Sequence, residues 1–197
     1  MDITLGPLGI TWRGNRGGAA LISQYGSAFE EAVERGSVWA TANQTTVTTQ
    51  AGLSATTPAL TIANRNGSGR WVKIWYVSCT SLVAAGAAAA IFAALGRRNG
   101  TAVTETTAAT VANMLTGDAT APSGVACLAV ATLPAAPVAI GILGAQTTAA
   151  ITTAPVGSFF ERYYNGALFI DEGCNFSIQT STASTLFCEY LFEVVPK

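Results

Sequence analysis

The chain has 197 residues, of which 50% are hydrophobic and only 11% are charged, against about 25% in an ordinary soluble domain. So much apolar sequence excludes intrinsic disorder, and a formal net charge of −1 argues against a nucleic-acid-binding surface. The chain has no His, the commonest general base and metal ligand, so we expect neither an enzyme nor a protein that binds a metal or cofactor.

The N-terminal region, residues 1–36, differs in character from the rest of the chain. Its Gly-containing runs at residues 6–9 and 13–18 favour loops and turns, so we expect an extended arm. Residues 37–197 are expected to form a single β-sandwich domain.

One short helix is predicted at the end of the arm. Ser27, followed three residues later by Glu30, has the form of a capping box. Phe29 and Ala32 share one face of this helix, and Gly36 suits the position just after its last turn.

From residue 37 onward, short runs rich in β-branched and aromatic residues alternate with turn signals. The expected strands are residues 38–50, 59–63, 70–81, 87–96, 125–133, 138–143, 166–170, 174–180 and 185–195. Residues 106–117 fit either a helix that stops at Gly117 or a loop.

These segments predict an all-β fold, an antiparallel β-sandwich of about eight strands with jelly-roll connections. Their apolar runs are continuous instead of cleanly alternating, which is typical of strands buried on both faces. We therefore expect the second face of the strands to lie against other copies of the chain.

Two uncharged stretches, residues 74–96 and 119–160, are long enough to cross a membrane. The first opens with β-branched, aromatic and hydroxylated residues, and the second contains four prolines, which break helices. We expect no membrane span. The N-terminus shows no basic region followed by an apolar core, so no signal peptide is expected and synthesis in a host cytoplasm is predicted.

The four cysteines, Cys79, Cys127, Cys174 and Cys188, are widely spaced and contain no Cys-x-x-Cys pair. We expect buried free thiols, which behave as small apolar side chains. A disulfide between Cys174 and Cys188 across one hairpin is the alternative.

Acidic residues near the C-terminus are the remaining candidates for catalysis. Asp171 and Glu172 can be read as a glycoside-hydrolysing pair beside aromatic residues, but the following Gly173 favours a turn. Glu189 and Glu193 share one face of the last strand, where we expect them to be exposed or paired with Arg.

Aromatic residues on the expected strands allow a second hypothesis. Five of them can form a stacking platform for a sugar or a base: Trp71, Trp75, Tyr76, Tyr163 and Tyr164. Packing inside the fold is the competing interpretation.

Partner binding is predicted at five residues. Four of them are cations in flexible, Gly-containing segments, from which they can reach the acidic surface of a partner; the fifth lies on the predicted helix. The set is Arg13, Arg16, Phe29, Arg97 and Arg98. Simple solvation of the surface is the alternative for the arginines.

Several segments share a common style of sequence. They are residues 45–54 (TTVTTQAGLS), 57–64 (TPALTIAN), 67–70 (GSGR), 131–138 (ATLPAAPV), 166–170 (GALFI) and 192–196 (FEVVP). Together they resemble a group of tailed-bacteriophage virion proteins, of the jelly-roll capsid decoration (cement) kind. The resemblance implies a β-sandwich structural subunit, often trimeric, that decorates a capsid or belongs to a tail, and it implies no catalytic residues.

The resemblance and the shortage of charge predict a structural protein of the virion. We expect a capsid decoration subunit that stabilises the phage head. Its expected partners are further copies of itself, in a symmetric trimer, and the major capsid protein or another virion protein. The alternative is a tail or fibre module that binds host glycan through Trp71, Trp75 or the pair Tyr163 and Tyr164.

Overall fold

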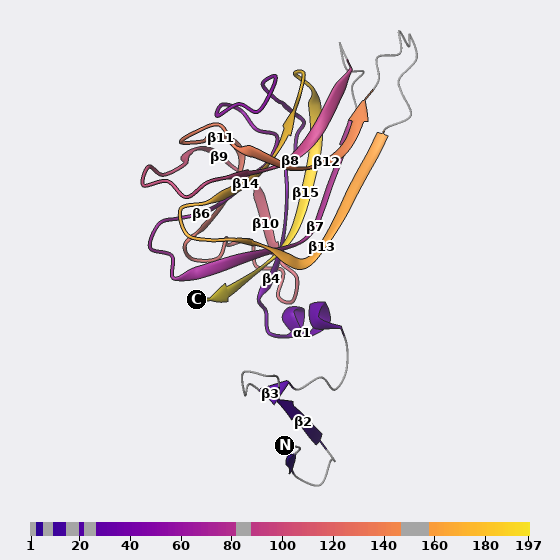
Figure 1. The fold of residues 1–197 in the computed structure, drawn as a ribbon, viewed down its shortest axis with the longest axis vertical. Coiled ribbons are helices and arrows are strands. Elements are labelled where there is room, and N and C mark those ends of the chain that lie inside the picture. The colour runs from indigo at the N-terminus through magenta and orange to yellow at the C-terminus, as the bar shows by residue number, and fades with distance from the viewer. Residues whose placement is uncertain (1–2, 6–9, 15–19, 22–26, 82–87, 147–157) are drawn as a thin grey trace.

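The computed structural model of the chain describes residues 3–5, 10–14, 20–21, 27–81, 88–146 and 158–197 (Figure 1). Strands make up most of these residues, and one short helix precedes the main body. In chain order the elements are β1 (Ile3–Leu5), β2 (Ile10–Gly14), β3 (Ala20–Leu21), α1 (Ala28–Glu34), β4 (Val38–Ala42), β5 (Val47–Thr48), β6 (Thr61–Asn64), β7 (Arg70–Ser81), β8 (Ala89–Gly96), β9 (Thr104–Ala108), β10 (Thr110–Asn113), β11 (Val125–Thr132), β12 (Val138–Gln146), β13 (Ser158–Ile170), β14 (Asn175–Thr180) and β15 (Thr185–Pro196).

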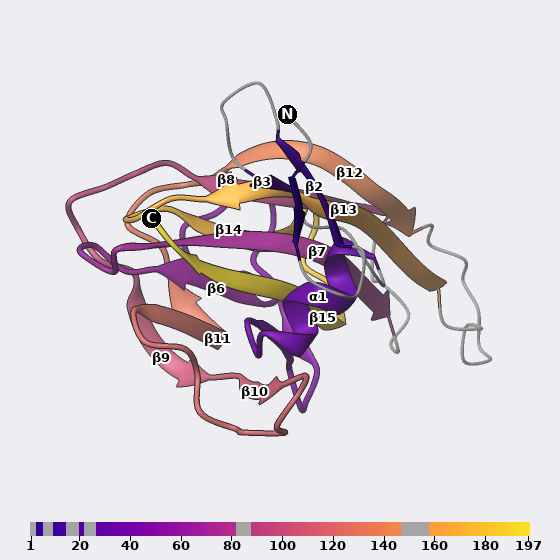
Figure 2. The same cartoon turned by 90° about the horizontal axis from the view of Figure 1, so that it is seen from below.

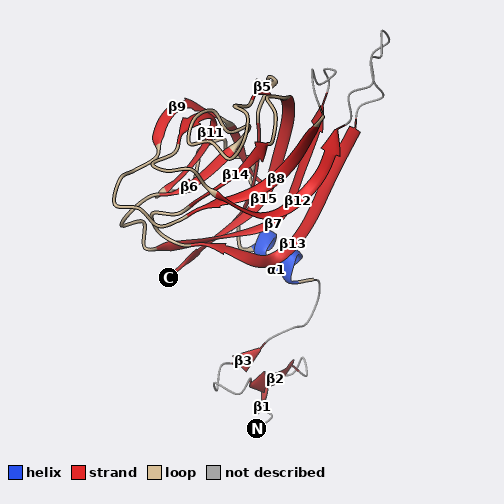
Figure 3. Cartoon of the chain, turned by 45° about the horizontal axis from the view of Figure 1, so that its top comes forward, coloured by secondary structure: helices blue, strands red, loops and turns tan. Residues whose placement is uncertain are grey.

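Two six-stranded antiparallel sheets pack face to face as a sandwich (Figures 1 and 3). Sheet 1 has the order β10-β4-β15-β7-β13, with β5 paired to β15, and sheet 2 has the order β12-β8-β14-β6-β11-β9. Strands β1, β2 and β3 form a small sheet of their own. The prediction of an all-β antiparallel sandwich is confirmed.

Eight of the strands have jelly-roll connectivity. When β4, β6, β7, β8, β12, β13, β14 and β15 are numbered one to eight, sheet 1 contains the order 1-8-3-6 and sheet 2 the order 2-7-4-5. Strands β5, β9, β10 and β11 extend this framework at the sides of the sheets. The expected count of about eight is therefore the jelly-roll core, and the two sheets hold twelve strands in all.

The core lies between the sheets and is built from alternate residues of each strand. On β15, Cys188, Tyr190 and Phe192 point inward and are buried. The Tyr190 hydroxyl donates a hydrogen bond to the Leu60 carbonyl at 2.7 Å, which satisfies the one polar group of this large buried side chain.

The outer face of sheet 2 is partly covered by the chain itself, and its cover by other copies stays a prediction. Every residue of β14 is buried, including the outward-facing Ser177 and Gln179. Loops of the same chain provide part of this cover: the Ser54 amide donates to the Gln179 side chain at 3.4 Å, and Val103 packs on the outer cluster around Leu128.

Three stretches of the predicted strand pattern were wrong in detail. The strand expected at residues 166–170 is the end of the longer β13, which begins at Ser158. The expected strand 38–50 is broken into β4 and β5 at Asn43, whose buried side chain bonds to the backbone of β15. In the segment 106–117, expected to be a helix or a loop, residues 106–113 form most of β9 and all of β10, and residues 114–116 form a turn. Pairing with β11 and β4 supplies the backbone hydrogen bonds that outweigh the helical spacing of the apolar residues.

The helix α1 begins as predicted. The Ser27 hydroxyl accepts a hydrogen bond from the Glu30 amide, the Glu30 carboxylate accepts one from the Ser27 amide, and Gly36 has a positive φ of 66°. Figure 2 shows the helix lying across β7 and β15, on the outer face of sheet 1. The Phe29 and Trp75 rings meet edge to face at 5.3 Å, so α1 contacts the sandwich directly. The domain boundary at residue 36 stays a prediction.

All four cysteines are free. The suggested approach of Cys174 to Cys188 was wrong, because β14 and β15 belong to different sheets. Instead Cys188 lies directly opposite Cys79 on β7. In the part of the chain that the structure describes, no helix has the length and apolar character that a membrane span requires.

Candidate interaction surfaces

A cavity of about 460 Å³ opens on the outer face of sheet 1, where the start of α1 meets β7, β13 and β15. We call it the aromatic cavity. Four of its lining side chains are aromatic rings, and the complete lining is Ser27, Ala28, Phe29, Trp75, Tyr76, Tyr163, Asn165 and Leu191. Its size is in the range of sites that bind small ligands or single side chains.

Two irregularities in the strands build the aromatic cavity. On β7, the register against β15 shifts by one residue at Trp75, so the consecutive residues Trp75 and Tyr76 both line the cavity. On β13, the register shifts between Tyr163 and Leu168, where Asn165 and Gly166 have positive φ angles. A Cβ atom at Gly166 would lie 3.2 Å from the Trp75 indole, so the absence of a side chain lets this ring pack under the bulge.

Carboxylates flank the aromatic cavity. Tyr76 donates a hydrogen bond from its hydroxyl to Glu161 at 3.1 Å. One row further along the sheet, Glu161 on β13 and Glu189 on β15 stand on either side of Ser78. Partial burial raises the pKa of Tyr76, and the negative charges of Glu161 and Glu189 raise it further. Both carboxylates are exposed, and neither forms an ion pair among the described residues.

A second feature is an exposed apolar edge where the two sheets meet. The edge strands β12 of sheet 2 and β13 of sheet 1 lie side by side (Figure 1). Side chains at Gly141 and Gly144 would collide with Arg162 and Phe160 of β13, so these glycines allow the close approach. The exposed apolar side chains of this β12–β13 edge are Val138, Ile140, Ile142, Phe159, Tyr163 and Phe169.

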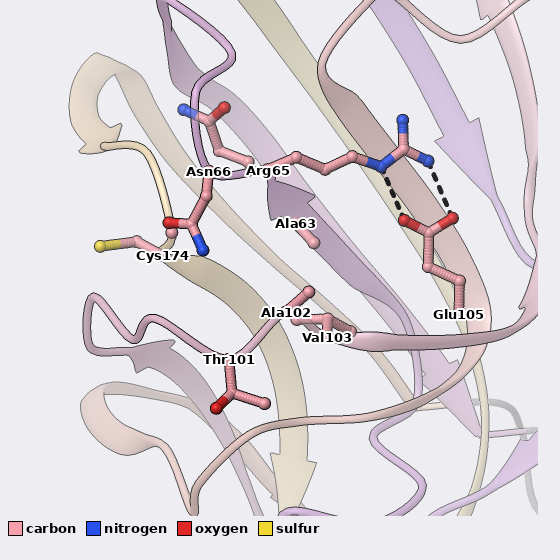
Figure 4. A pocket seen from close by; sticks show the side chains of 10 residues that line it. Ala63, Arg65, Asn66, Thr101, Ala102, Val103, Glu105 and Cys174 are labelled. Carbon is pink, nitrogen blue, oxygen red and sulfur yellow. Dashed lines mark hydrogen bonds and ion pairs between the residues drawn. The ribbon is translucent and has the colours of Figure 1, made fainter.

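A third feature, a cavity of about 260 Å³, lies beside β6, β9 and the turn before β14 (Figure 4). Arg65 donates to both carboxylate oxygens of Glu105 at 2.7 and 2.8 Å, and this pairing lowers the pKa of Glu105. Cys174 also lines the cavity, but partial burial and the Asp171 carboxylate raise the pKa of its thiol. The cavity therefore holds a thiol that is protonated at neutral pH, and Arg65 is already engaged.

The structure separates the residues predicted to bind a partner. Phe29 lines the aromatic cavity, whereas Arg97 and Arg98 do not. Arg13 lies on β2, and Arg16 falls outside the described residues. Arg97 and Arg98 are exposed just after β8, where Arg98 pairs with Glu172 at 3.7 Å.

The candidate sugar platform is also divided. Trp75 and Tyr163 line the aromatic cavity together. Trp71 instead meets Phe169 edge to face at 6.0 Å, and Tyr164 turns inward to pack against Phe176 of the core. Tyr76, also predicted for this platform, lines the cavity as well. Adjacent residues on a regular strand point to opposite faces, and only the bulge places both Trp75 and Tyr76 on one face.

The Asp171 and Glu172 carboxylates hold the turn between β13 and β14. Asp171 pairs with Lys197 at 2.7 Å, which lowers the pKa of the Asp171 carboxyl. Glu172 accepts from the Gly69 amide at 2.7 Å and also faces Arg98. Phe176, one of the aromatic residues that lie near them in the sequence, is fully buried in the core. The turn interpretation therefore accounts for both carboxylates.

Among the described residues, no group of three or more His, Cys, Asp or Glu side chains is placed to hold a metal ion. Comparisons with family models, curated proteins and solved structures found no match to this chain.

Proposed function

We propose that the protein is a structural subunit of a tailed-phage virion. In this proposal it is a capsid decoration protein that forms symmetric oligomers, trimers by the resemblance of its sequence, and stabilises the head. The observation that carries the proposal is the apolar β12–β13 edge. The jelly-roll topology agrees with it, since viral capsid domains use this fold, but lectins and cupins use it as well.

The β12–β13 edge has the character of a contact surface between proteins. Ile142 is 65% exposed and Phe159 is 60% exposed, which is unusual for large apolar side chains gathered on two adjoining strands. Burying one such side chain contributes about 1.5–3 kcal/mol. Association through this edge would remove several of them from water, in a chain with few charges to keep its surface soluble.

We expect the substitution Ile142→Asp to break the oligomer. A carboxylate in a buried apolar contact has no partner and is strongly unfavourable there. Sedimentation equilibrium of the full chain should show an oligomer for the natural sequence and a folded monomer for the variant. The matched control is Leu115→Asp, because Leu115 is also exposed but follows β10, at the opposite side of sheet 1 from β13. A natural chain that stays monomeric at micromolar concentration would contradict the proposal.

The location in a virion is tested separately. Mass spectrometry of purified particles should detect the chain in a fixed copy number relative to the major capsid protein. Heads stripped of the chain should bind the purified oligomer again and withstand heating better than stripped heads alone. Recovery of the chain only from detached tails would replace decoration of the head with a tail role.

A further inference from the structure

The aromatic cavity combines rings with carboxylates that have no cationic partner among the described residues. We propose that it receives an arginine side chain from the N-terminal arm, residues 1–26, of a second copy of the chain. This inference rests on the proposed self-association and assigns it a second contact, which adjoins the β12–β13 edge at Tyr163.

The chemistry of the cavity fits a guanidinium group. A cation over an aromatic face is attracted by the ring, and a planar guanidinium also stacks on it. The molecule already uses such contacts nearby: the Lys73 ammonium lies 5.5 Å from the centre of the Phe169 ring, and the Arg162 guanidinium lies 5.2 Å from that of Tyr164.

The charge around the cavity is unbalanced. Glu161 and Glu189 stand beside the rings, and the first turn of α1 adds Glu30 and Glu31. Among the described residues, the cations next to this face are Arg35 and Lys73, which pair with the buried Glu193 at 3.3 and 3.4 Å. Arg35 also lies 4.0 Å from Glu31. These two cations therefore leave Glu161 and Glu189 without compensation, which favours an incoming cation over a neutral sugar ring.

The arm supplies the complementary charge. It contains Arg13 and Arg16 and a single acidic residue, Asp2. Strand β2, which carries Arg13, pairs with β1 and β3 and with no strand of the two large sheets of its own chain. The arm joins the body at Ser27, on the rim of the cavity, so each copy presents a cavity beside the start of an arm.

The test uses two variants of the full chain. The arm variant carries Arg13→Ala and Arg16→Ala, and the cavity variant carries Glu161→Gln and Glu189→Gln. Glutamine at position 161 still accepts the hydrogen bond from Tyr76, so the cavity keeps its shape and loses only its charge. Arg65→Ala, which removes one exposed cation that pairs with Glu105 away from this cavity, is the control.

Each variant should weaken the oligomer, with a dissociation constant raised about tenfold, while thermal unfolding of the subunit stays unchanged. An equimolar mixture should associate more tightly than either variant alone, because arms of the cavity variant can enter cavities of the arm variant. An oligomer of natural strength in both variants would overturn the inference and leave the proposed function intact, whereas a monomeric natural chain would overturn the proposed function first. If the mixture associates no more tightly than either variant alone, the arm of one copy does not enter the cavity of another, and the inference is overturned.

A competition experiment separates a cation site from a sugar site. N-acetyl-arginine amide should dissociate the natural oligomer at millimolar concentration, and methyl glucoside and methyl galactoside should have no effect. Binding of either glycoside to the cavity, without an effect of the arginine derivative, would overturn the inference in favour of a sugar-binding site.

Discussion

Glu193 is a buried charge on the outer face of sheet 1. Its carboxylate is almost fully buried. It accepts hydrogen bonds from Arg35 and the Ser37 hydroxyl, just after α1, both at 3.3 Å, and lies 3.4 Å from the Lys73 ammonium. Glu193 was expected to be exposed or paired with Arg. The pairing with Arg35 is confirmed, but Glu193 is only 1% exposed. Glu189, four residues earlier on the same face, is exposed because α1 does not extend over it.

Loss of both cations around Glu193 should be strongly destabilising. A buried carboxylate whose partners are removed keeps its cost of dehydration without compensation. We expect Arg35→Met with Lys73→Met to lower the free energy of unfolding by about 3 kcal/mol, as measured by urea denaturation. Adding Glu193→Gln to this pair should restore part of the loss.

The matched control is Arg65→Met, which breaks the half-exposed pair of Arg65 with Glu105. Exposed pairs contribute about 0–1 kcal/mol, so this variant should change stability little. An equal loss in the two experiments would show that burial of Glu193 is unimportant.

At the scale of the element, the break between β4 and β5 illustrates how side chains replace strand pairing. The Asn43 side chain donates to the Thr45 and Leu186 carbonyls at 2.8 and 3.0 Å and accepts from the Cys188 amide at 2.6 Å. It therefore supplies the backbone partners that a continuous strand would have provided. Residues 38–50 read as one strand in sequence, because an Asn side chain that is buried and bonded in this way looks there like an ordinary polar residue.

The substitution Asn43→Ala should cost about 3 kcal/mol of unfolding free energy, since it leaves the Cys188 amide and the Leu186 carbonyl buried without partners. Asn66→Ala is the control, because Asn66 makes its bonds to the Asn99 and Gly100 carbonyls at an exposed site. Urea denaturation checks both variants. A small effect at position 43 would mean that water reaches the freed backbone groups.

At the scale of the whole molecule, both sheets contribute thiols to one core. Cys79 and Cys188 come from sheet 1 and Cys127 from sheet 2, and all three are buried. Burial raises the pKa of Cys79 and of Cys127 to about 12 and that of Cys188 well above its usual value. These thiols are protonated at pH 8 and shielded, so they react only when the sandwich opens.

We expect a thiol reagent at pH 8 to modify one cysteine of the native chain, the half-buried Cys174, and all four in denaturant. The variant Cys174→Ser should show no reaction until it unfolds, and the other three thiols should then react at one common rate. Rapid reaction of Cys79 or Cys188 in the native chain would contradict the closed sandwich.

The sequence by itself determined the all-β class, the jelly-roll sandwich, most strands and the capped start of α1. These features follow from local rules: strand-forming residues, turn residues at short spacing, and a capping box that acts within one turn. Which side chains come together, at the surface and in the core, follows only from the tertiary structure. The bulge that places Trp75 and Tyr76 on one face depends on the register of β7 against β15. The position of Cys79 opposite Cys188, and the contact of Arg35 with Glu193, join residues that are far apart in the chain. The register of a strand and the burial of its side chains are set only when the strands pair and the sheets pack. Each of these contacts needs a residue from a distant part of the chain, which the local sequence does not contain.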